Sequence, residues 1–196
     1  MKGGRDCPSV GPVVSSVMHE NYLKSLELVL AAEGGYVDHP MDLGGVTNLG
    51  VTRKTLEAHL RRSVSDQEMR DLTRDDVEPI YREKYWDACK CDDLPSGIDY
   101  GVFDFAVNSG PHRAIKVLQE TTGARVDGRM GPQTLAEVGS ILPSVLLHDY
   151  AAARLDYLKR LSSFAHFGNG WTKRVNAACA EASAMINADG PEARDE

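Results

Sequence analysis

The amino-acid sequence predicts a mainly α (α+β) fold, in which a small irregular lobe containing β structure packs against a helical lobe. Apolar residues recur at helical spacing along most of the chain, and Ser, Thr and Pro stand where helices are expected to begin. One segment of tight turns breaks this pattern and is marked by Gly35, Gly44, Gly45 and Gly50. With 196 residues and 42% hydrophobic content, the chain can form one globular domain or two small, closely packed lobes.

A first helix is predicted over residues 20–33, where apolar side chains share one face. That face is formed by Tyr22, Leu23, Leu26, Val29 and Leu30. Glu33 falls on the same face, so we expect its carboxyl to point toward the apolar interior. Desolvation and the negative end of the helix dipole both favour the neutral form of an acid there, and a neutral glutamic acid can serve as a general acid. The alternative is a buried glutamate that is hydrogen-bonded for structure.

The glycine-rich segment carries Asp42 and Thr47, which follow Glu33 on the predicted turns. Acid-catalysed cleavage of a glycosidic bond needs a proton donor for the leaving oxygen and a carboxylate on the opposite side of the sugar. Glu33, Asp42 and Thr47 can supply the donor, the carboxylate and a hydroxyl that helps to position a water.

The stretch over residues 33–52, EGGYVDHPMDLGGVTNLGVT, resembles the signature of glycoside hydrolase family 108. This family consists of muramidases and includes phage endolysins and bacterial proteins once labelled secretion activators. The order of Glu, Asp and Thr is also similar to that in phage-type lysozymes. The resemblance implies a lysozyme-like fold, with Glu33 as the catalytic acid and with Asp42 and Thr47 as the pair on the water side.

Helix-starting residues divide the middle of the chain. Thr52 is expected to cap a helix that runs to about residue 62, and Ser65 and Glu68 have the spacing of a capping box. Thr73 is expected to begin a helix that continues to about residue 88. The loop over residues 89–97 is the predicted boundary between the two regions of the chain.

The second half of the chain is predicted to be helical throughout. Helices are expected around residues 98–106, 111–122, after 131, from 144 and over 168–187. The stretch from residue 102 to 134, VFDFAVNSGPHRAIKVLQETTGARVDGRMGPQT, resembles the carboxy-terminal half of the same family, a predicted peptidoglycan-binding region. The expected divisions are a flexible extension (1–18), a lysozyme-like catalytic region (19–95), a helical peptidoglycan-binding-like region packed against it (96–187) and a disordered tail (188–196).

Four residues are expected to contact the substrate: Tyr36, Asn48, Trp86 and Asn108. The indole of Trp86 can stack on a sugar face, although an aromatic residue at the end of a helix is more often part of a core. The amide of Asn108 can bind a sugar acetamido group or a water, and its alternative role is to cap the helix before it.

Composition excludes several classes of function. The net charge of −7 argues against a nucleic-acid partner. Four cysteines give no disulfide framework, and the histidines form no HExxH motif, so we expect no metal site and no cofactor. No apolar run is long enough for membrane insertion, which needs about 20 residues.

The start of the chain lacks the apolar core of a signal peptide. We therefore expect synthesis in the cytoplasm without a signal peptide and action on the cell wall in the periplasm, after release or non-classical export. A holin-type release route and a secretion machine are the two candidate partners for this step.

The expected activity is hydrolysis of the β-1,4 bond between N-acetylmuramic acid and N-acetylglucosamine in peptidoglycan glycan strands. A lytic transglycosylase is the nearest alternative, because it needs one glutamate, and a chitinase is the next. A wall-binding secretion accessory protein without catalytic activity is the alternative from another class.

Overall fold

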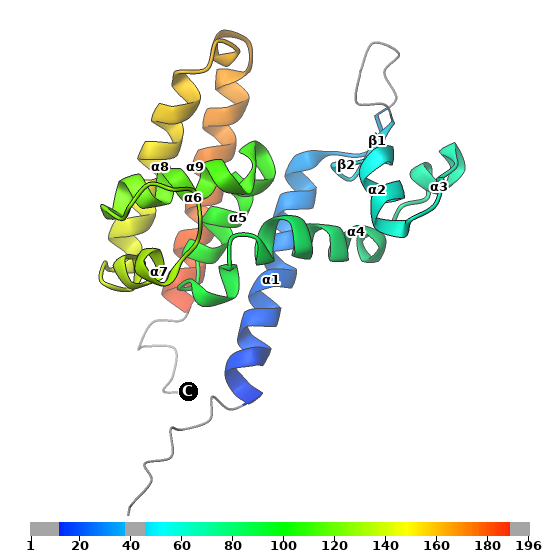
Figure 1. Ribbon diagram of the computed structural model, residues 1–196. Coiled ribbons are helices and arrows are strands. Elements are labelled where there is room, and N and C mark those ends of the chain that lie inside the picture. The colour runs from blue at the N-terminus through cyan, green and yellow to red at the C-terminus, as the bar shows by residue number, and fades with distance from the viewer. Residues whose placement is uncertain (1–11, 38–45, 189–196) are drawn as a thin grey trace, which may run out of the picture.

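The computed structural model describes residues 12–37 and 46–188. Within these ranges the protein is mainly helical, as predicted, with one small antiparallel sheet (Figure 1). Helix α1 (Pro12–Glu33) runs through the middle of the molecule. The small lobe with strands β1 and β2 lies at the right of α1 in Figure 1, and the helices of the second half of the chain lie at the left.

Helix α1 begins earlier than the predicted start at residue 20. It starts at Pro12, within residues 1–18, which were predicted to form a flexible extension. Proline is favoured at the first helical position, because its fixed φ suits a helix and it has no N–H group to leave unpaired. Residues 1–11 lie outside the described part of the chain. At the other end, residue 188 still belongs to a helix, and the predicted tail beyond it is not described.

The small lobe is built from short elements with the predicted caps. Its elements are β1 (Thr47–Asn48), β2 (Val51–Thr52), α2 (Arg53–Leu60), α3 (Asp66–Arg70) and α4 (Arg74–Tyr81). The hydroxyl of Thr52 accepts a hydrogen bond from the amide of Thr55, and Ser65 and Glu68 form the predicted capping box. Beyond α4 the chain does not stay α-helical to residue 88: it widens into a π-helix, η1 (Arg82–Asp87), and a short 3₁₀ helix, η2 (Cys91–Asp93), follows.

The second half of the chain forms a helical lobe around α5 (Ile98–Ser109), in which residues 98–106 are all buried. The surrounding helices are α6 (Pro111–Thr122), α7 (Pro132–Gly139), α8 (Pro143–Lys159) and α9 (Phe164–Ala188). Helices α8 and α9 pack along each other and against α5 (Figure 1). Gly123 ends α6 in a left-handed conformation, directly after the predicted range of 111–122.

One hydrophobic core runs through both halves of the chain. At its centre the rings of Tyr22 from α1, Trp86 from η1 and Phe103 from α5 meet edge to face, with centroids 5.1 to 6.1 Å apart. In the described part of the chain, no helix is both long and apolar enough to cross a bilayer.

Candidate active site

Glu33 is the last residue of α1 and lies where the helix meets the small lobe. Its side chain is 22% exposed. The next residue, Gly34, has a φ of 83°, a left-handed conformation that ends the helix. The β1–β2 turn lies against the side chain, because a Cβ on Gly50 would lie 3.2 Å from Glu33 Cγ. The carboxyl is therefore half-buried at the junction of two parts of the fold.

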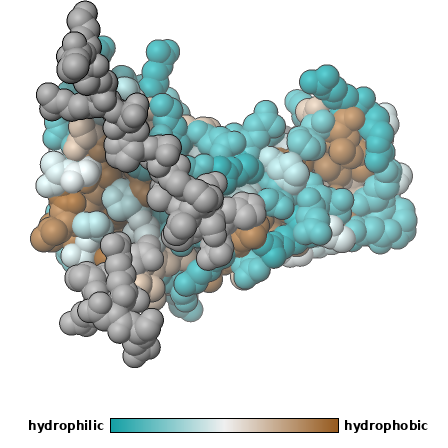
Figure 2. Space-filling view, turned by 90° about the horizontal axis from the view of Figure 1, so that it is seen from below, coloured by the Kyte–Doolittle hydropathy of each residue, from teal (hydrophilic) through white to brown (hydrophobic). Residues whose placement is uncertain are grey.

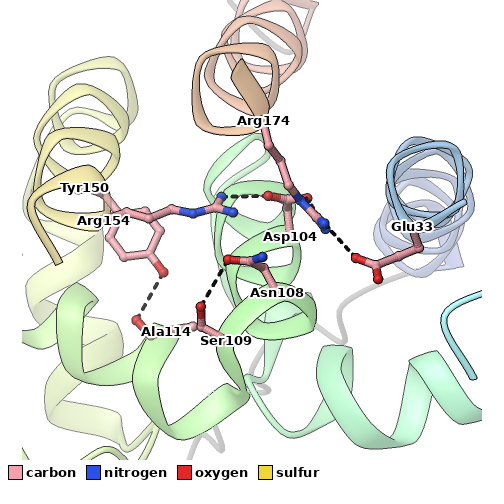
Figure 3. Close-up of polar contacts among 8 residues, drawn as sticks. All are labelled: Glu33, Asp104, Asn108, Ser109, Ala114, Tyr150, Arg154 and Arg174. Atoms are coloured by element: carbon pink, nitrogen blue, oxygen red, sulfur yellow. Dashed lines mark hydrogen bonds and ion pairs between the residues drawn. The ribbon is translucent and has the colours of Figure 1, made fainter. Parts of the chain in front are cut away.

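The Glu33 carboxyl has a charged partner that the sequence did not reveal. Nη1 of Arg174, on α9, lies 2.7 Å from Glu33 Oε1 (Figure 3). The carboxyl was expected to lie in an apolar site, where desolvation would keep it neutral. The structure shows a guanidinium beside the carboxyl, a contact that the sequence analysis did not foresee.

Asp104 on α5 holds the arginine in place. Asp104 is almost fully buried, and Oδ1 accepts a hydrogen bond of 3.0 Å from Nε of Arg174. Its other oxygen, Oδ2, accepts a bond of 2.6 Å from Nη1 of Arg154 on α8. We call Glu33, Arg174, Asp104 and Arg154 the charge network (Figure 3). It joins α1, α5, α8 and α9 and contains two guanidinium groups and two carboxyl groups.

The charge network changes the acid–base properties of Arg174. Burial alone would lower the pKa of its guanidinium, but the carboxylates of Asp104 and Glu33 outweigh burial and raise it. Arg174 is therefore positively charged at neutral pH.

Two tyrosines flank Glu33 from the small lobe. Burial, and then the negative charge of Glu33, raise the pKa of Tyr81 well above its usual range. The same two causes raise the pKa of Tyr85. Both phenols therefore stay neutral at physiological pH. The Tyr81 hydroxyl donates a hydrogen bond of 2.9 Å to the carbonyl oxygen of Leu49 and thereby fixes the β1–β2 turn beside Glu33.

A cavity of about 540 Å³ lies beside the charge network, between α1, α5 and α9. Its wall includes Arg174 and Asp104 together with polar and aromatic groups from Tyr100, Asn108 and Trp171. A second cavity of about 450 Å³ lies between α2, α3 and α4. That part of the small lobe shows an apolar patch in Figure 2. Glu33 and Thr47 line neither of these two cavities, but the cavity beside Arg174 is lined by Ala32, the residue before Glu33, and by Arg174, which contacts the Glu33 carboxyl.

Of the other two predicted catalytic residues, the structure describes Thr47 but not Asp42. Asp42 lies outside the described residues. Thr47 begins β1, and its backbone exchanges two hydrogen bonds with Val37, of 2.8 and 3.0 Å. This bridge holds together the two ends of the segment that carries Asp42.

Two of the predicted substrate contacts have structural roles. Trp86 is fully buried, and its Nε1 donates a hydrogen bond of 2.8 Å to Asp92, so its ring cannot stack on a sugar. The prediction for Trp86 is therefore wrong. Asn48 is 5% exposed, and its amide nitrogen donates to the backbone carbonyls of Met69 and Arg70, which ties β1 to α3.

The remaining two predicted contacts stay accessible. Tyr36 is half-buried, and the guanidinium of Arg70 lies 5.2 Å from its ring centroid. Asn108 lies in the last turn of α5 and on the wall of the cavity beside Arg174. The residue at the C-cap position is Gly110, so Asn108 is not the helix cap.

The sequence analysis missed Arg174, Asp104 and Trp171. A signal was present for Asp104, because a charged residue inside the apolar stretch VFDFAV needs a buried partner. No local pattern identified the partner. As for metals, no group of His, Cys, Asp or Glu within residues 12–37 and 46–188 could hold an ion.

A mainly helical fold with a small β lobe and a half-buried glutamate at their junction defines a lysozyme-like protein. Residues 26–110 match the family model described as glycosyl hydrolase 108, and residues 113–176 match the model described as a predicted peptidoglycan domain. The solved structure of SagA from Brucella abortus is 43% identical in sequence, with a TM-score of 0.76. The match covers 86% of this chain and 97% of the SagA chain. The chain therefore belongs to glycosyl hydrolase family 108.

The family confirms the coarser part of the functional prediction: the protein is a glycoside hydrolase that acts on peptidoglycan. No match is found among the curated proteins. The charge network spans both matched regions. Its two carboxyl groups, Glu33 and Asp104, lie in the first region, and its two arginines, Arg154 and Arg174, lie in the second.

Proposed function

We propose that the protein is an N-acetylmuramidase, which hydrolyses the β-1,4 bond between N-acetylmuramic acid and N-acetylglucosamine, with Glu33 as the general acid. The observation that carries this proposal is the place of the Glu33 carboxyl. It is half-buried at the end of α1, against the β1–β2 turn and beside a large cavity. A glycan strand that lies between the two lobes would pass this carboxyl.

The proposed roles follow the chemistry of glycoside hydrolysis. Glu33 donates a proton to the leaving glycosidic oxygen, while Asp42, with the Thr47 hydroxyl, holds a water on the opposite face of the sugar. The backbone bridge between Val37 and Thr47 supports this assignment, because it pairs Thr47 with a residue four positions after Glu33. A separation of about 6.5 to 9.5 Å between the two carboxyl groups gives inversion, and about 5 to 5.5 Å gives retention.

The cavity beside Arg174 is the proposed sugar-binding surface. Trp171 is half-buried there, so one part of its ring is free to stack on a sugar face. The Asn108 amide on the same wall is suited to an acetamido group, since an amide both donates and accepts hydrogen bonds. Trp171 thus takes the stacking role that the sequence suggested for Trp86, and Tyr36 is proposed to contact the glycan from the small lobe.

The direct test is digestion of purified peptidoglycan sacculi by the wild type and by Glu33→Gln, with the products identified by mass spectrometry. Glutamine keeps the shape of the side chain but cannot donate the acid proton. We expect reducing muropeptides from the wild type and a loss of at least about 100-fold in rate for the variant. A Glu120→Gln variant, changed at an exposed position of α6, is the matched control and should keep full activity.

The products also separate the alternatives. Anhydro muropeptides would make the enzyme a lytic transglycosylase, and release of sugars from chitin at a comparable rate would make it a chitinase. Binding to sacculi without any product would favour a wall-binding secretion accessory protein. On the present proposal the place of action is the cell wall, reached by a holin-type release route or through a secretion machine.

A further inference from the structure

We propose that Arg174 is a positioning residue for Glu33, which holds the carboxyl through Oε1 and leaves Oε2 as the oxygen that donates the proton. This inference rests on the proposed muramidase function. If the inference holds, the region that matches the predicted peptidoglycan domain contributes to catalysis, because Arg174 lies in that region. The catalytic centre is then completed only when both matched regions are folded together.

The first step is that Arg174 is fixed independently of Glu33. Its Nε and Nη2 lie 3.0 and 2.9 Å from Oδ1 of Asp104, and Asp104 is itself held by the buried Arg154. A planar guanidinium with two nitrogens on one carboxylate has little freedom to turn. Its remaining nitrogen, Nη1, then reaches Glu33 Oε1 from a fixed direction.

The second step concerns the two oxygens of Glu33. An arginine donates hydrogen bonds and accepts none, so the oxygen that it contacts must be an acceptor in both protonation states. Oε1 is that oxygen, and among the described residues Oε2 accepts no hydrogen bond. When Glu33 is neutral, its proton therefore resides on Oε2, the oxygen left available to a substrate.

The third step follows the charge through the reaction. The proton moves from Oε2 to the glycosidic oxygen as the bond from that oxygen to the anomeric carbon breaks, and the bonding electron pair stays with the leaving oxygen. Glu33 becomes negatively charged in this step. Arg174 is already in place to stabilise that charge, so no reorganisation is needed as it develops.

Among the groups that surround the Glu33 carboxyl, Arg174 is the charged one in direct contact with it. From α4 and η1 the carboxyl is faced by Tyr81 and Tyr85, whose pKa values are raised, so both rings are neutral. From α5, Asp104 lies behind the guanidinium. Within the described residues, Arg174 is the cation that contacts Glu33.

A purely structural role for Arg174 is the alternative, because the charge network also ties four helices together. Arg154 provides the matched control. It is buried, it binds the same carboxylate of Asp104, and it makes no contact with Glu33. A structural role predicts similar effects from changing either arginine, whereas a positioning role predicts a larger effect on Glu33 from Arg174, which contacts it directly.

The experiment measures the titration of the Glu33 carboxyl directly. Protein labelled with ¹³C at the glutamate carboxyl carbons is followed by NMR from pH 3 to pH 9, and the Glu33 signal is assigned by its loss in Glu33→Gln. Arg174→Met removes the charge that favours the carboxylate, so Glu33 should keep its proton to higher pH than in the wild type. Arg174→Lys should restore part of the shift, and Arg154→Met, which removes no contact of Glu33 itself, should shift the titration less than Arg174→Met does. Arg154→Lys replaces Arg154→Met if the latter does not fold.

Activity supplies the second readout. For Arg174→Met we expect kcat on sacculi to fall by about 10- to 100-fold, because an acid displaced by about 1 Å loses that much. The fall in activity at high pH should move to higher pH, because the acid then keeps its proton longer. An unchanged Glu33 titration, or an equal shift from Arg154→Met, would overturn the inference. Since the titration needs no turnover, an inactive wild type would refute the muramidase proposal separately.

Discussion

Gly50 faces the phenolic hydroxyl of Tyr81 so closely that a Cβ at position 50 would lie 2.3 Å from that oxygen. The same glycine has a φ of 71°, a left-handed conformation that residues with a side chain rarely adopt. The hydroxyl cannot easily withdraw, because it donates its hydrogen bond to the carbonyl of Leu49, in the same turn. The β1–β2 turn therefore requires glycine at this position in order to pack beside Glu33.

We expect Gly50→Ala to lower the free energy of unfolding by about 2 to 3 kcal/mol, from the strained backbone and the displaced tyrosine together. Activity on sacculi should fall as well, since the added methyl group also lies 3.2 Å from Glu33 Cγ. Urea unfolding and product release measure the two effects. Gly35→Ala is the control, because a Cβ there meets nothing within 4 Å, and it should stay within about 0.5 kcal/mol of the wild type. An equal loss in both variants would contradict the role given to Tyr81.

The parts of the fold that could be predicted are those fixed by near neighbours in the sequence. A capping box joins residues three apart, as for Ser65 and Glu68, and a left-handed glycine such as Gly123 acts on the helix just before it. The periodicity of α1 likewise placed Glu33 on a helix that ends at the small lobe. These signals need no knowledge of tertiary structure.

The parts that could not be predicted depend on distant segments. Glu33 and Arg174 are 141 positions apart, and no spacing rule connects them. The burial of Trp86 is also set from afar, since its ring packs against Tyr22 of α1 and Phe103 of α5. Sequence reasoning therefore selected Glu33 as the proposed acid but missed its charged partner, and it assigned the stacking role to an indole that the core encloses.

The capping box at the start of α3 predicts a dependence of stability on pH. Hydrogen bonds from the Ser65 backbone and side chain, together with Arg62, hold the pKa of Glu68 at about 2, below its ordinary value of 4.5. A carboxyl whose pKa is lowered by folding stabilises the fold above the pKa of the unfolded state. That contribution is complete above about pH 4.5 and is lost as the pH falls toward 2.

We therefore expect wild type to have a higher urea midpoint than Glu68→Gln at pH 7, and we expect the difference to shrink steadily below pH 4.5. Glutamine can still accept the hydrogen bonds, so the variant isolates the charge. Urea unfolding at a series of pH values between 7 and 3 measures the difference. Glu120→Gln, at an exposed position of α6, should show no such trend. A difference that stays constant down to pH 3 would contradict the assignment.

Trp171 offers a test of where the glycan binds. If its ring stacks on a sugar in the cavity beside Arg174, Trp171→Ala should raise KM for sacculus fragments by about 3- to 10-fold, which corresponds to the typical strength of an aromatic contact. The rate constant kcat should change little, because Trp171 makes no contact with Glu33. Leu142→Ala is the control for the loss of an exposed apolar side chain, since Leu142 is 71% exposed and lies outside the cavity. Trp86→Phe should lower stability and leave KM unchanged, because Trp86 is enclosed in the core. If KM rose for Trp86→Phe and not for Trp171→Ala, the glycan would have to bind on another surface.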